Sequence, residues 1–209
     1  VARSLVLALD CDAEPVVVLT KADRCDAGEL ERDLDRVRRL VGPDVRVIVT
    51  SSAEGRGLDE VRACVPVGSC AMILGESGAG KSTLLNALLG HDTLATGGVR
   101  ERDDQGRHTT VARVMVALPG DAGVIADAPG LRSLPLVGHE RGLARAFPEI
   151  VEASRACRFG DCTHTHEPGC AVREAEDAGQ IDSLRLETFQ NLASSMRVSA
   201  QMLDPDVHL

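Results

Sequence analysis

The sequence predicts an α/β fold, in which a mostly parallel sheet carries helices on both faces, joined to a small and mainly helical second domain. Short apolar runs alternate with stretches of helical periodicity from about residue 15 to residue 126. From about residue 149 this pattern gives way to a cluster of cysteines and histidines, followed by helical sequence. We therefore expect a first domain over residues 1–148 and a second domain over residues 149–209.

The composition of the 209-residue chain fits one domain of this kind with a small addition. Hydrophobic residues make up 44% of it, and the core must be mainly aliphatic because Trp and Tyr are absent. The net charge of −9 argues against a broad basic surface for nucleic acid, although a local basic contact stays open. No apolar run is long enough to cross a membrane and no secretory signal pattern is present, so we expect a cytoplasmic protein without a membrane partner.

The N-terminal half of the predicted sheet begins with the apolar run at residues 15–19, which indicates a buried strand. Asp26, with Glu29 in the capping-box position, predicts the start of a helix, and Gly42-Pro43 predicts its end. The apolar residues between these signals recur on one helix face. Two further elements follow by the same criteria, a strand at residues 45–50 and a short helix at residues 57–65.

The C-terminal half of the sheet is predicted to start with a strand at residues 71–74, followed by a helix at residues 81–89 whose leucines share one side. Residues 90–110 carry many charges and little periodicity, which predicts a loop. Pro119-Gly120-Asp121 predicts a turn between two more strands. Those strands are expected at residues 111–118 and 123–126, and helical sequence runs again from residue 171 to residue 201.

A glycine-rich segment lies between the strand at residues 71–74 and the helix that follows it. Its glycines let the backbone turn sharply and direct N–H groups at phosphate oxygens, and the helix N-terminus adds partial positive charge. Lys81 would contact the β- and γ-phosphates during catalysis, and the Ser82 hydroxyl would coordinate Mg²⁺. The predicted phosphate-binding residues are Gly75, Glu76, Ser77, Gly78, Ala79, Gly80, Lys81, Ser82 and Thr83.

Two short motifs, each following a predicted strand, have the residues that read a guanine base. Asp23 would accept hydrogen bonds from guanine N1 and N2, a pair of donors that adenine does not offer. Lys21 would lie along the base and ribose, and the Ala53 N–H would meet guanine O6. Thr20 stands where asparagine is usual, so we expect weaker guanine binding through the loss of an amide that ties neighbouring loops together. The predicted residues are Thr20, Lys21, Ala22, Asp23, Ser52 and Ala53, and a solvated turn is the alternative for the first motif taken alone.

Asp127 ends an apolar strand downstream of the phosphate loop and is followed by Ala128-Pro129-Gly130. Its carboxylate could hold Mg²⁺ through water, and the Gly130 N–H could sense the γ-phosphate. Either Thr109 or Thr110, between the phosphate loop and Asp127, would complete the Mg²⁺ shell, and the spacing leaves the choice open.

Leu131 follows this motif, where many GTPases place a glutamine that orients the attacking water. Leucine cannot orient water, so His108 is the candidate for that catalytic role, and a merely solvated histidine is the alternative. The base-reading motifs also precede the phosphate loop, whereas an ordinary small GTPase has the phosphate loop first. This rotated order predicts a circularly permuted P-loop GTPase domain.

The second domain begins with the spacing Cys157-x4-Cys162-x-His164-x5-Cys170. Three thiolates and one imidazole can form a closed tetrahedral site for one structural Zn²⁺. His166 competes with His164 as the nitrogen ligand, and the spacing does not decide between them. Buried thiols or a disulfide are the alternative to a metal site.

Taken together, the rotated order, G-E-S-G-A-G-K-S, G-R-H-T-T, D-A-P-G and C-x4-C-x-H-x5-C resemble ribosome small-subunit-dependent GTPase A, a family of circularly permuted bacterial GTPases that act late in 30S assembly. The resemblance covers nearly the whole chain, including residues 181–192, where Arg185 and Phe189 match the family's arginine and aromatic positions. Departures are Thr20, Ala128 where threonine is frequent, and an acidic C-terminal region.

The resemblance implies slow GTP hydrolysis that the small subunit stimulates, after which the protein leaves, with His108 implicated in the stimulated step. It implies that the partners are GTP and GDP, the 30S subunit and its 16S rRNA. The family contacts the RNA mainly through an N-terminal OB-fold, which we expect this fragment to lack. The acidic C-terminal region limits direct RNA contact here to Arg155, Arg158 and Arg173. We expect a monomer. The alternative functions are a GTP-binding assembly scaffold with negligible turnover and a P-loop ATPase of another class.

Overall fold

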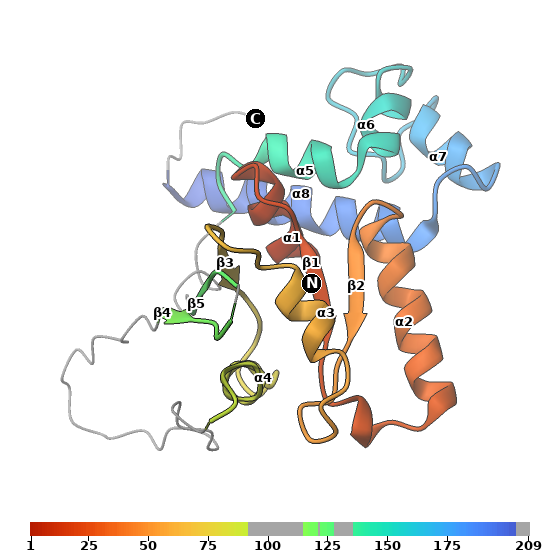
Figure 1. Ribbon diagram of the computed structural model, residues 1–209. Helices are drawn as coiled ribbons and strands as arrows, with labels where there is room; N and C mark the ends of the chain where they lie inside the picture. The colour runs from red at the N-terminus through yellow and green to blue at the C-terminus, as the bar shows by residue number, and fades with distance from the viewer. Residues whose placement is uncertain (92–114, 121, 128–135, 204–209) are drawn as a thin grey trace, which may run out of the picture. The chain divides into compact units, whose positions relative to one another are not determined.

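The computed structural model describes residues 1–91, 115–120, 122–127 and 136–203 and has the predicted α/β character (Figure 1). The loop expected at residues 90–110 lies almost entirely outside these residues, as does the first part of the strand expected at residues 111–118. In chain order the elements are α1 (Ala2–Asp10), β1 (Val16–Leu19), the 3-10 helix η1 (Ala22–Arg24), α2 (Ala27–Val41), β2 (Arg46–Val49), α3 (Leu58–Ala63), β3 (Cys70–Ile73), α4 (Lys81–Leu89), β4 (Met115–Ala117), β5 (Val124–Asp127), α5 (Glu140–Ala146), α6 (Pro148–Ser154), α7 (Ala171–Asp177) and α8 (Ser183–Leu203).

The chain divides into two compact units. One comprises Val1–Pro15, Asp35–Arg46 and Pro135–Leu209, and the other comprises Val16–Leu34 and Val47–Leu134. The domain boundary that the sequence suggests after residue 148 stays a prediction. No described helix combines the length and the apolar character that a bilayer crossing requires.

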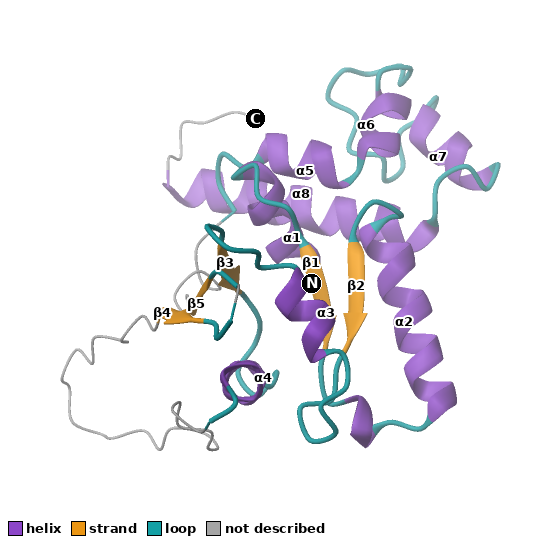
Figure 2. Cartoon of the chain, viewed as in Figure 1, coloured by secondary structure: helices purple, strands orange, loops and turns teal. Residues whose placement is uncertain are grey.

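The strands of the described residues form two small sheets (Figure 2). β1 pairs with β2, and the other sheet has the order β3-β5-β4. β3 and β5 run parallel with Ile73 opposite Asp127, whereas β4 and β5 run antiparallel with Val116 opposite Ile125. The antiparallel pair follows from the short turn predicted at residues 119–121, since strands joined by a tight turn must reverse direction.

Helices α3 and α4 bury aliphatic side chains against these strands. The leucines predicted on one side of α4 behave as expected, with Leu84, Leu85 and Leu88 buried and Leu89 partly buried. The buried side chains of this core are Ile48, Val61, Val65, Leu84, Leu85, Leu88, Leu118 and Ile125. The ends of β1, β2, β3 and β5 are thereby held around one apolar centre, and these ends lead into the predicted site motifs.

Helix α2 begins and ends at the predicted signals. Glu29 N–H donates to Asp26 Oδ1 over 2.8 Å, and Asp26 N–H donates to Glu29 Oε2 over 3.3 Å, so the capping box is formed. The helix stops at Val41, before Gly42, whose φ of +85° suits glycine.

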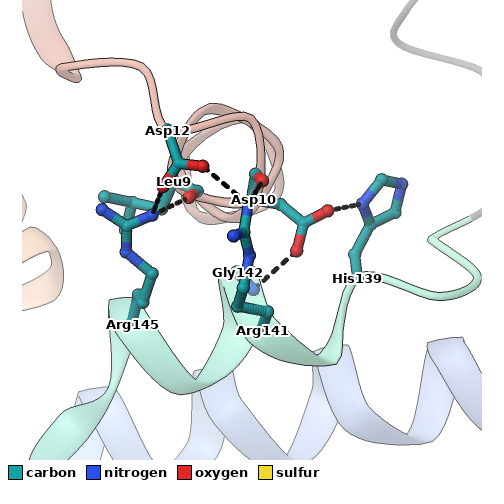
Figure 3. A network of polar contacts seen from close by, with 7 residues as sticks. All are labelled: Leu9, Asp10, Asp12, His139, Arg141, Gly142 and Arg145. Atoms are coloured by element: carbon teal, nitrogen blue, oxygen red, sulfur yellow. Dashed lines mark hydrogen bonds and ion pairs between the residues drawn. The ribbon is translucent and has the colours of Figure 1, made fainter.

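In the other unit, α1 packs closely against α5. A Cβ added to Gly142 would collide with the carbonyl of Val6, so only glycine allows this approach. The C-terminal end of α1 also carries polar contacts to α5 (Figure 3). Asp10 accepts hydrogen bonds from His139 Nδ1 and from Gly142 N–H, both over 2.8 Å, and Asp12 pairs with Arg141 and Arg145.

The helical sequence expected from residue 171 to residue 201 forms two helices, α7 and α8, separated by residues 178–182. Gly179 has a φ of +71°, which does not fit a helix interior. Asp182 Oδ1 then accepts a hydrogen bond from Leu184 N–H over 2.8 Å and caps α8.

Arg185 on α8 is buried and links the elements of this unit. It forms an ion pair with Glu149, donates to the carbonyls of Ala146 and Leu40, and lies 4.9 Å from the ring centre of Phe147.

Candidate functional site: a guanine-reading motif joined to a phosphate loop

The predicted phosphate loop, residues 75–82, connects β3 to the first turn of α4. Gly80 precedes the helix with a φ of +83°, a conformation that glycine adopts at little cost. Lys81 Nζ turns back into the loop and donates to the carbonyls of Gly75 and Glu76, each over 2.8 Å. The loop therefore closes around the amine that the sequence predicts to meet the phosphates.

The predicted base-reading motif lies against this loop. Thr20 Oγ1 donates to the carbonyl of Ala79 over 2.7 Å, across 59 residues of sequence, and Lys21 Nζ donates to the carbonyl of Gly78. A Cβ at Gly80 would lie 3.3 Å from Thr20 Oγ1, so the approach is close. The Thr20 hydroxyl thus connects the two loops in place of the asparagine amide, and the expectation of weaker guanine binding stays a prediction.

Both lysines of the chain lie at this junction, since the sequence contains only Lys21 and Lys81. Lys21 also has a φ of +61°, which is uncommon for a residue with a side chain. Such strain is typical of functional positions, where the surroundings hold a residue in place.

A buried serine orients the carboxylate of Asp23. Ser51 Oγ donates to Asp23 Oδ1 over 2.7 Å and accepts a hydrogen bond from Glu54 N–H over 3.2 Å. Ser51 reaches this position because β1 and β2 pair, with Thr50 N–H donating to the carbonyl of Leu19 over 2.7 Å. The Ser51 hydrogen bond lowers the pKa of Asp23 below its usual value, which keeps this carboxylate ionised as a hydrogen-bond acceptor.

Ser51 belongs to the same predicted motif as Ser52 and Ala53, but the sequence does not indicate its hydrogen bond to Asp23. The available signal was its place as the first residue after a predicted strand, beside the motif that contains Asp23. Ser52 is partly buried and Ala53 is exposed at the end of β2, and their contacts to a base stay predictions.

Asp127 lies where a metal-binding carboxylate is expected. It pairs with Ile73 in the register of β3 and β5, so it ends its strand beside the strand that enters the phosphate loop. Its Oδ1 atom is buried and has no hydrogen-bond partner within the described part of the chain. Ser82 lies in the first turn of α4. A buried carboxylate oxygen and a hydroxyl are suitable donors for Mg²⁺ or its bound water, so these residues fit the ion.

The remaining predicted residues divide into two groups. Ser77 and Thr83 are exposed, and Ala22 is buried in η1. The structure describes no part of the predicted switch, so His108, Thr109, Thr110, Gly130 and Leu131 lie outside the described residues.

The four residues proposed to bind zinc come together in the other unit. Cys157, Cys162, His164 and Cys170 place their ligand atoms within 4.8 Å of one another. His164 Nδ1 lies 3.6 Å from Cys157 Sγ and 3.5 Å from Cys170 Sγ, and the two sulfurs are 3.9 Å apart. A tetrahedral Zn²⁺ with bonds of about 2.3 Å to sulfur and about 2.0 Å to nitrogen requires separations of about 3.5 Å and about 3.8 Å. The cluster therefore fits zinc, and it includes His164 and not His166.

Burial and hydrogen bonding shift the pKa values of three of these residues in different directions. Burial raises the pKa of Cys162 to about 12, and burial lowers the pKa of His164, which favours the neutral imidazole. Burial acts to raise the pKa of Cys157, but hydrogen bonds from the N–H groups of Val172 and Ala171 and from Cys170 and Cys162 together lower this pKa below its usual value. All seven cysteines are free, so no disulfide competes with the metal site.

The three arginines predicted to contact RNA are exposed, and each contacts a neighbouring residue. The contacts are Arg155 with Glu152, Arg158 with the ring of Phe159, and Arg173 with the carbonyl of Thr165. Phe189 of α8 lies 6.1 Å from the His164 ring and 5.8 Å from the Phe147 ring, so it belongs to the packing behind the cluster.

Comparison with known proteins identifies the family. The model of the RsgA GTPase family matches residues 1–137. The chain belongs to the RsgA GTPase family. This confirms the resemblance seen in the motifs, and with it the circularly permuted α/β fold.

The relatives are proteins named small ribosomal subunit biogenesis GTPase RsgA. The one from Streptomyces avermitilis is 48% identical over 193 residues, which cover 92% of this chain and 51% of that protein. The one from Streptomyces coelicolor is 45% identical and covers 91% of this chain and 51% of its own length. The chain thus spans about half the length of the curated RsgA relatives it matches.

Solved structures of similar fold include YjeQ from Thermotoga maritima, with a TM-score of 0.67 and 26% identity over 97% of this chain and 65% of that one. YloQ, described as a circularly permuted GTPase, has a TM-score of 0.62 over 100% of this chain and 63% of its own. At 24% identity, YloQ supports the fold alone.

Proposed function

We propose that this chain is the GTP-hydrolysing part of an RsgA protein that acts in late maturation of the small ribosomal subunit. The observation that carries the proposal is the contact between the base-reading motif and the phosphate loop, made by Thr20 with Ala79 and by Lys21 with Gly78. One nucleotide would then reach both motifs. Asp23, held by Ser51, makes guanine the base, because adenine would leave the carboxylate without donors.

Hydrolysis requires stabilisation of charge on the transferred phosphoryl group. Lys81 supplies a positive charge, and the N-terminus of α4 directs backbone N–H groups toward the phosphates. Ser82, Asp127 and one of Thr109 and Thr110 would hold Mg²⁺, which neutralises charge on the phosphate oxygens when bound. Gly130 would sense the γ-phosphate, and His108 would position the attacking water.

The small subunit is the proposed partner because relatives carry its biogenesis in their names. Within this chain, Arg155, Arg158 and Arg173 would make local contacts to the RNA. The subunit would stimulate hydrolysis, and GDP formation would time release. The Cys157, Cys162, His164 and Cys170 cluster would hold one structural Zn²⁺.

The first test uses the two lysines. Lysine labelled with ¹³C at Cε gives two side-chain NMR signals from this chain, and both belong to the proposed site. Saturating GDP should shift both signals, whereas ADP at the same concentration should shift neither. A shift of the Lys81 signal alone, with equal effects of GDP and ADP, would support a P-loop ATPase of another class.

The second test measures phosphate release by the complete protein with and without 30S particles. We expect the particles to raise the rate and Lys81→Ala to abolish it. Tight GTP binding with no turnover in either condition would support the scaffold alternative.

A further inference from the structure

The loop that carries His164 has an unusual backbone. His164 has a φ of +61°, a left-handed conformation that a histidine rarely adopts. This conformation turns the ring toward Cys157 and Cys170 and buries it, with 6% of its surface exposed. Something must hold the loop in this form, because the backbone alone does not favour it.

The carboxylate of Glu167 gathers the polar groups of that loop. Its Oε1 atom accepts hydrogen bonds from Thr163 N–H over 2.8 Å and from Thr163 Oγ1. Its Oε2 atom accepts from Thr165 N–H over 3.0 Å and from His166 N–H over 3.1 Å. The donors flank His164 on both sides, so one side chain closes the turn around it.

Glu167 is not itself placed as a ligand. The group of ligand atoms within 4.8 Å of one another comprises three cysteines and His164, without Glu167. Its two oxygens are directed at the loop, where four donors already use them. A second support reaches the loop from α8, where Gln190 Nε2 donates to the carbonyl of His164 over 2.6 Å.

We infer that Glu167 is a positioning residue for the metal site, which holds residues 163–166 so that His164 is ready to bind the ion. The inference rests on the zinc site included in the proposed function. Groups that orient metal ligands commonly change metal affinity 10- to 100-fold when they are removed. Here the group orients the ligand through the backbone and not through its ring, so its loss should detach the imidazole while the three thiols remain.

The test compares the 209-residue chain with three variants. Glu167→Gln keeps the size of the side chain and removes its charge and its full accepting capacity. Thr163→Val removes the hydroxyl donor and leaves the carboxylate. Glu174→Gln makes the same charge change at an exposed residue of α7 outside the loop and serves as the control.

Zinc affinity is measured by competition with a chromophoric chelator under reducing conditions. We expect about a 10- to 100-fold loss for Glu167→Gln. A smaller loss is expected for Thr163→Val, and none for Glu174→Gln. The Co²⁺ absorption of Glu167→Gln should also differ from wild type because the nitrogen ligand is no longer held. Glu167→Gln should reduce zinc affinity by a larger factor than it changes the unfolding equilibrium of the metal-free chain, whereas a purely structural role of Glu167 would change unfolding and leave the metal affinity of the folded chain unaltered.

Wild-type zinc affinity and an unchanged Co²⁺ spectrum in Glu167→Gln would overturn the inference and leave the metal site standing. An equal loss in Glu174→Gln would also overturn it, because the effect would then be one of net charge. A wild-type chain that binds neither Zn²⁺ nor Co²⁺ would overturn the metal site and this inference together.

Discussion

Replacement of Thr20 by valine tests whether the base-reading motif and the phosphate loop act as one site. Valine has nearly the shape of threonine but lacks the hydroxyl that donates to the Ala79 carbonyl over 2.7 Å. The substitution therefore removes one hydrogen bond and little packing. Thr20→Ser is the matched control, since it keeps the hydroxyl and removes a methyl group.

The expected effect is that of one neutral hydrogen bond in a partly buried position. Such a bond contributes about 1 kcal/mol, with a range of about 0.5–1.5 kcal/mol. Ala79 is partly exposed, so water can satisfy its carbonyl to some extent and the upper end of the range is not expected. A loss of about 1 kcal/mol weakens GDP binding about fivefold.

Fluorescence titration with a labelled GDP analogue, confirmed by calorimetry with GDP, measures this change. The Thr20 hydrogen bond prearranges two motifs that GDP is proposed to contact together, so its loss should weaken binding of GDP more than binding of guanosine or pyrophosphate alone. A change in one motif by itself would instead weaken the corresponding small ligand by the same factor as GDP.

Equal GDP affinity in Thr20→Val and wild type would refute the reasoning, as would an equal loss in Thr20→Ser. Thr20→Asn restores a longer amide donor at this position. We expect it to bind GDP at least as well as Thr20→Val, because it can reach the same carbonyl.

Three other predictions follow from single contacts. Ser51→Ala removes the donor that lowers the pKa of Asp23, so this pKa should rise toward 3.8. On acidification, the variant should then lose GDP binding at a higher pH than wild type. GDP titrations that show the same pH of loss for both proteins would contradict this. Gly142→Ala should lower the free energy of unfolding by about 1–3 kcal/mol in urea titrations, because its Cβ would collide with a backbone carbonyl of α1. Gly28→Ala is the control and should not destabilise the chain, because its Cβ would meet no atom closer than 3.4 Å. Removal of the proposed zinc by a chelator should speed hydrogen exchange across residues 157–170 and leave GDP affinity unchanged. If GDP affinity falls together with the exchange protection, the metal also supports the nucleotide site.

Local signals in the sequence are sufficient to predict most of the helices and strands. Asp26 and Glu29 form the capping box that their spacing predicts, and Gly42 follows the end of α2. The phosphate loop was predictable because glycines, Lys81 and the flanking strand and helix are contiguous in sequence. The break between α7 and α8 was also detectable in principle, since Gly179 and the capping residue Asp182 are helix-ending and helix-starting signals.

Contacts between distant residues were not predictable in the same way. The Ser51 bond to Asp23 exists only because two strands pair, and a single sequence does not state which strands pair. Glu167 looks like an ordinary solvated acid in sequence, and its role depends on the left-handed turn at His164. The hydrogen bond from Thr20 to Ala79 joins residues 59 positions apart, and no local signal indicates which carbonyl the hydroxyl reaches.

The position of Asp127 explains why a rotated order of motifs is compatible with one nucleotide site. A site at the ends of strands needs those ends to be neighbours in space, and it does not require any order along the chain. The pairing of Ile73 with Asp127 brings one motif to the phosphate loop through the sheet. The predicted base-reading motif has no such pairing with β3 in the described residues. Its strands share an apolar core with β3, and the side chains of Thr20 and Lys21 add direct hydrogen bonds to the phosphate loop. Loss of these two hydrogen bonds should therefore weaken the coupling between base recognition and phosphate binding.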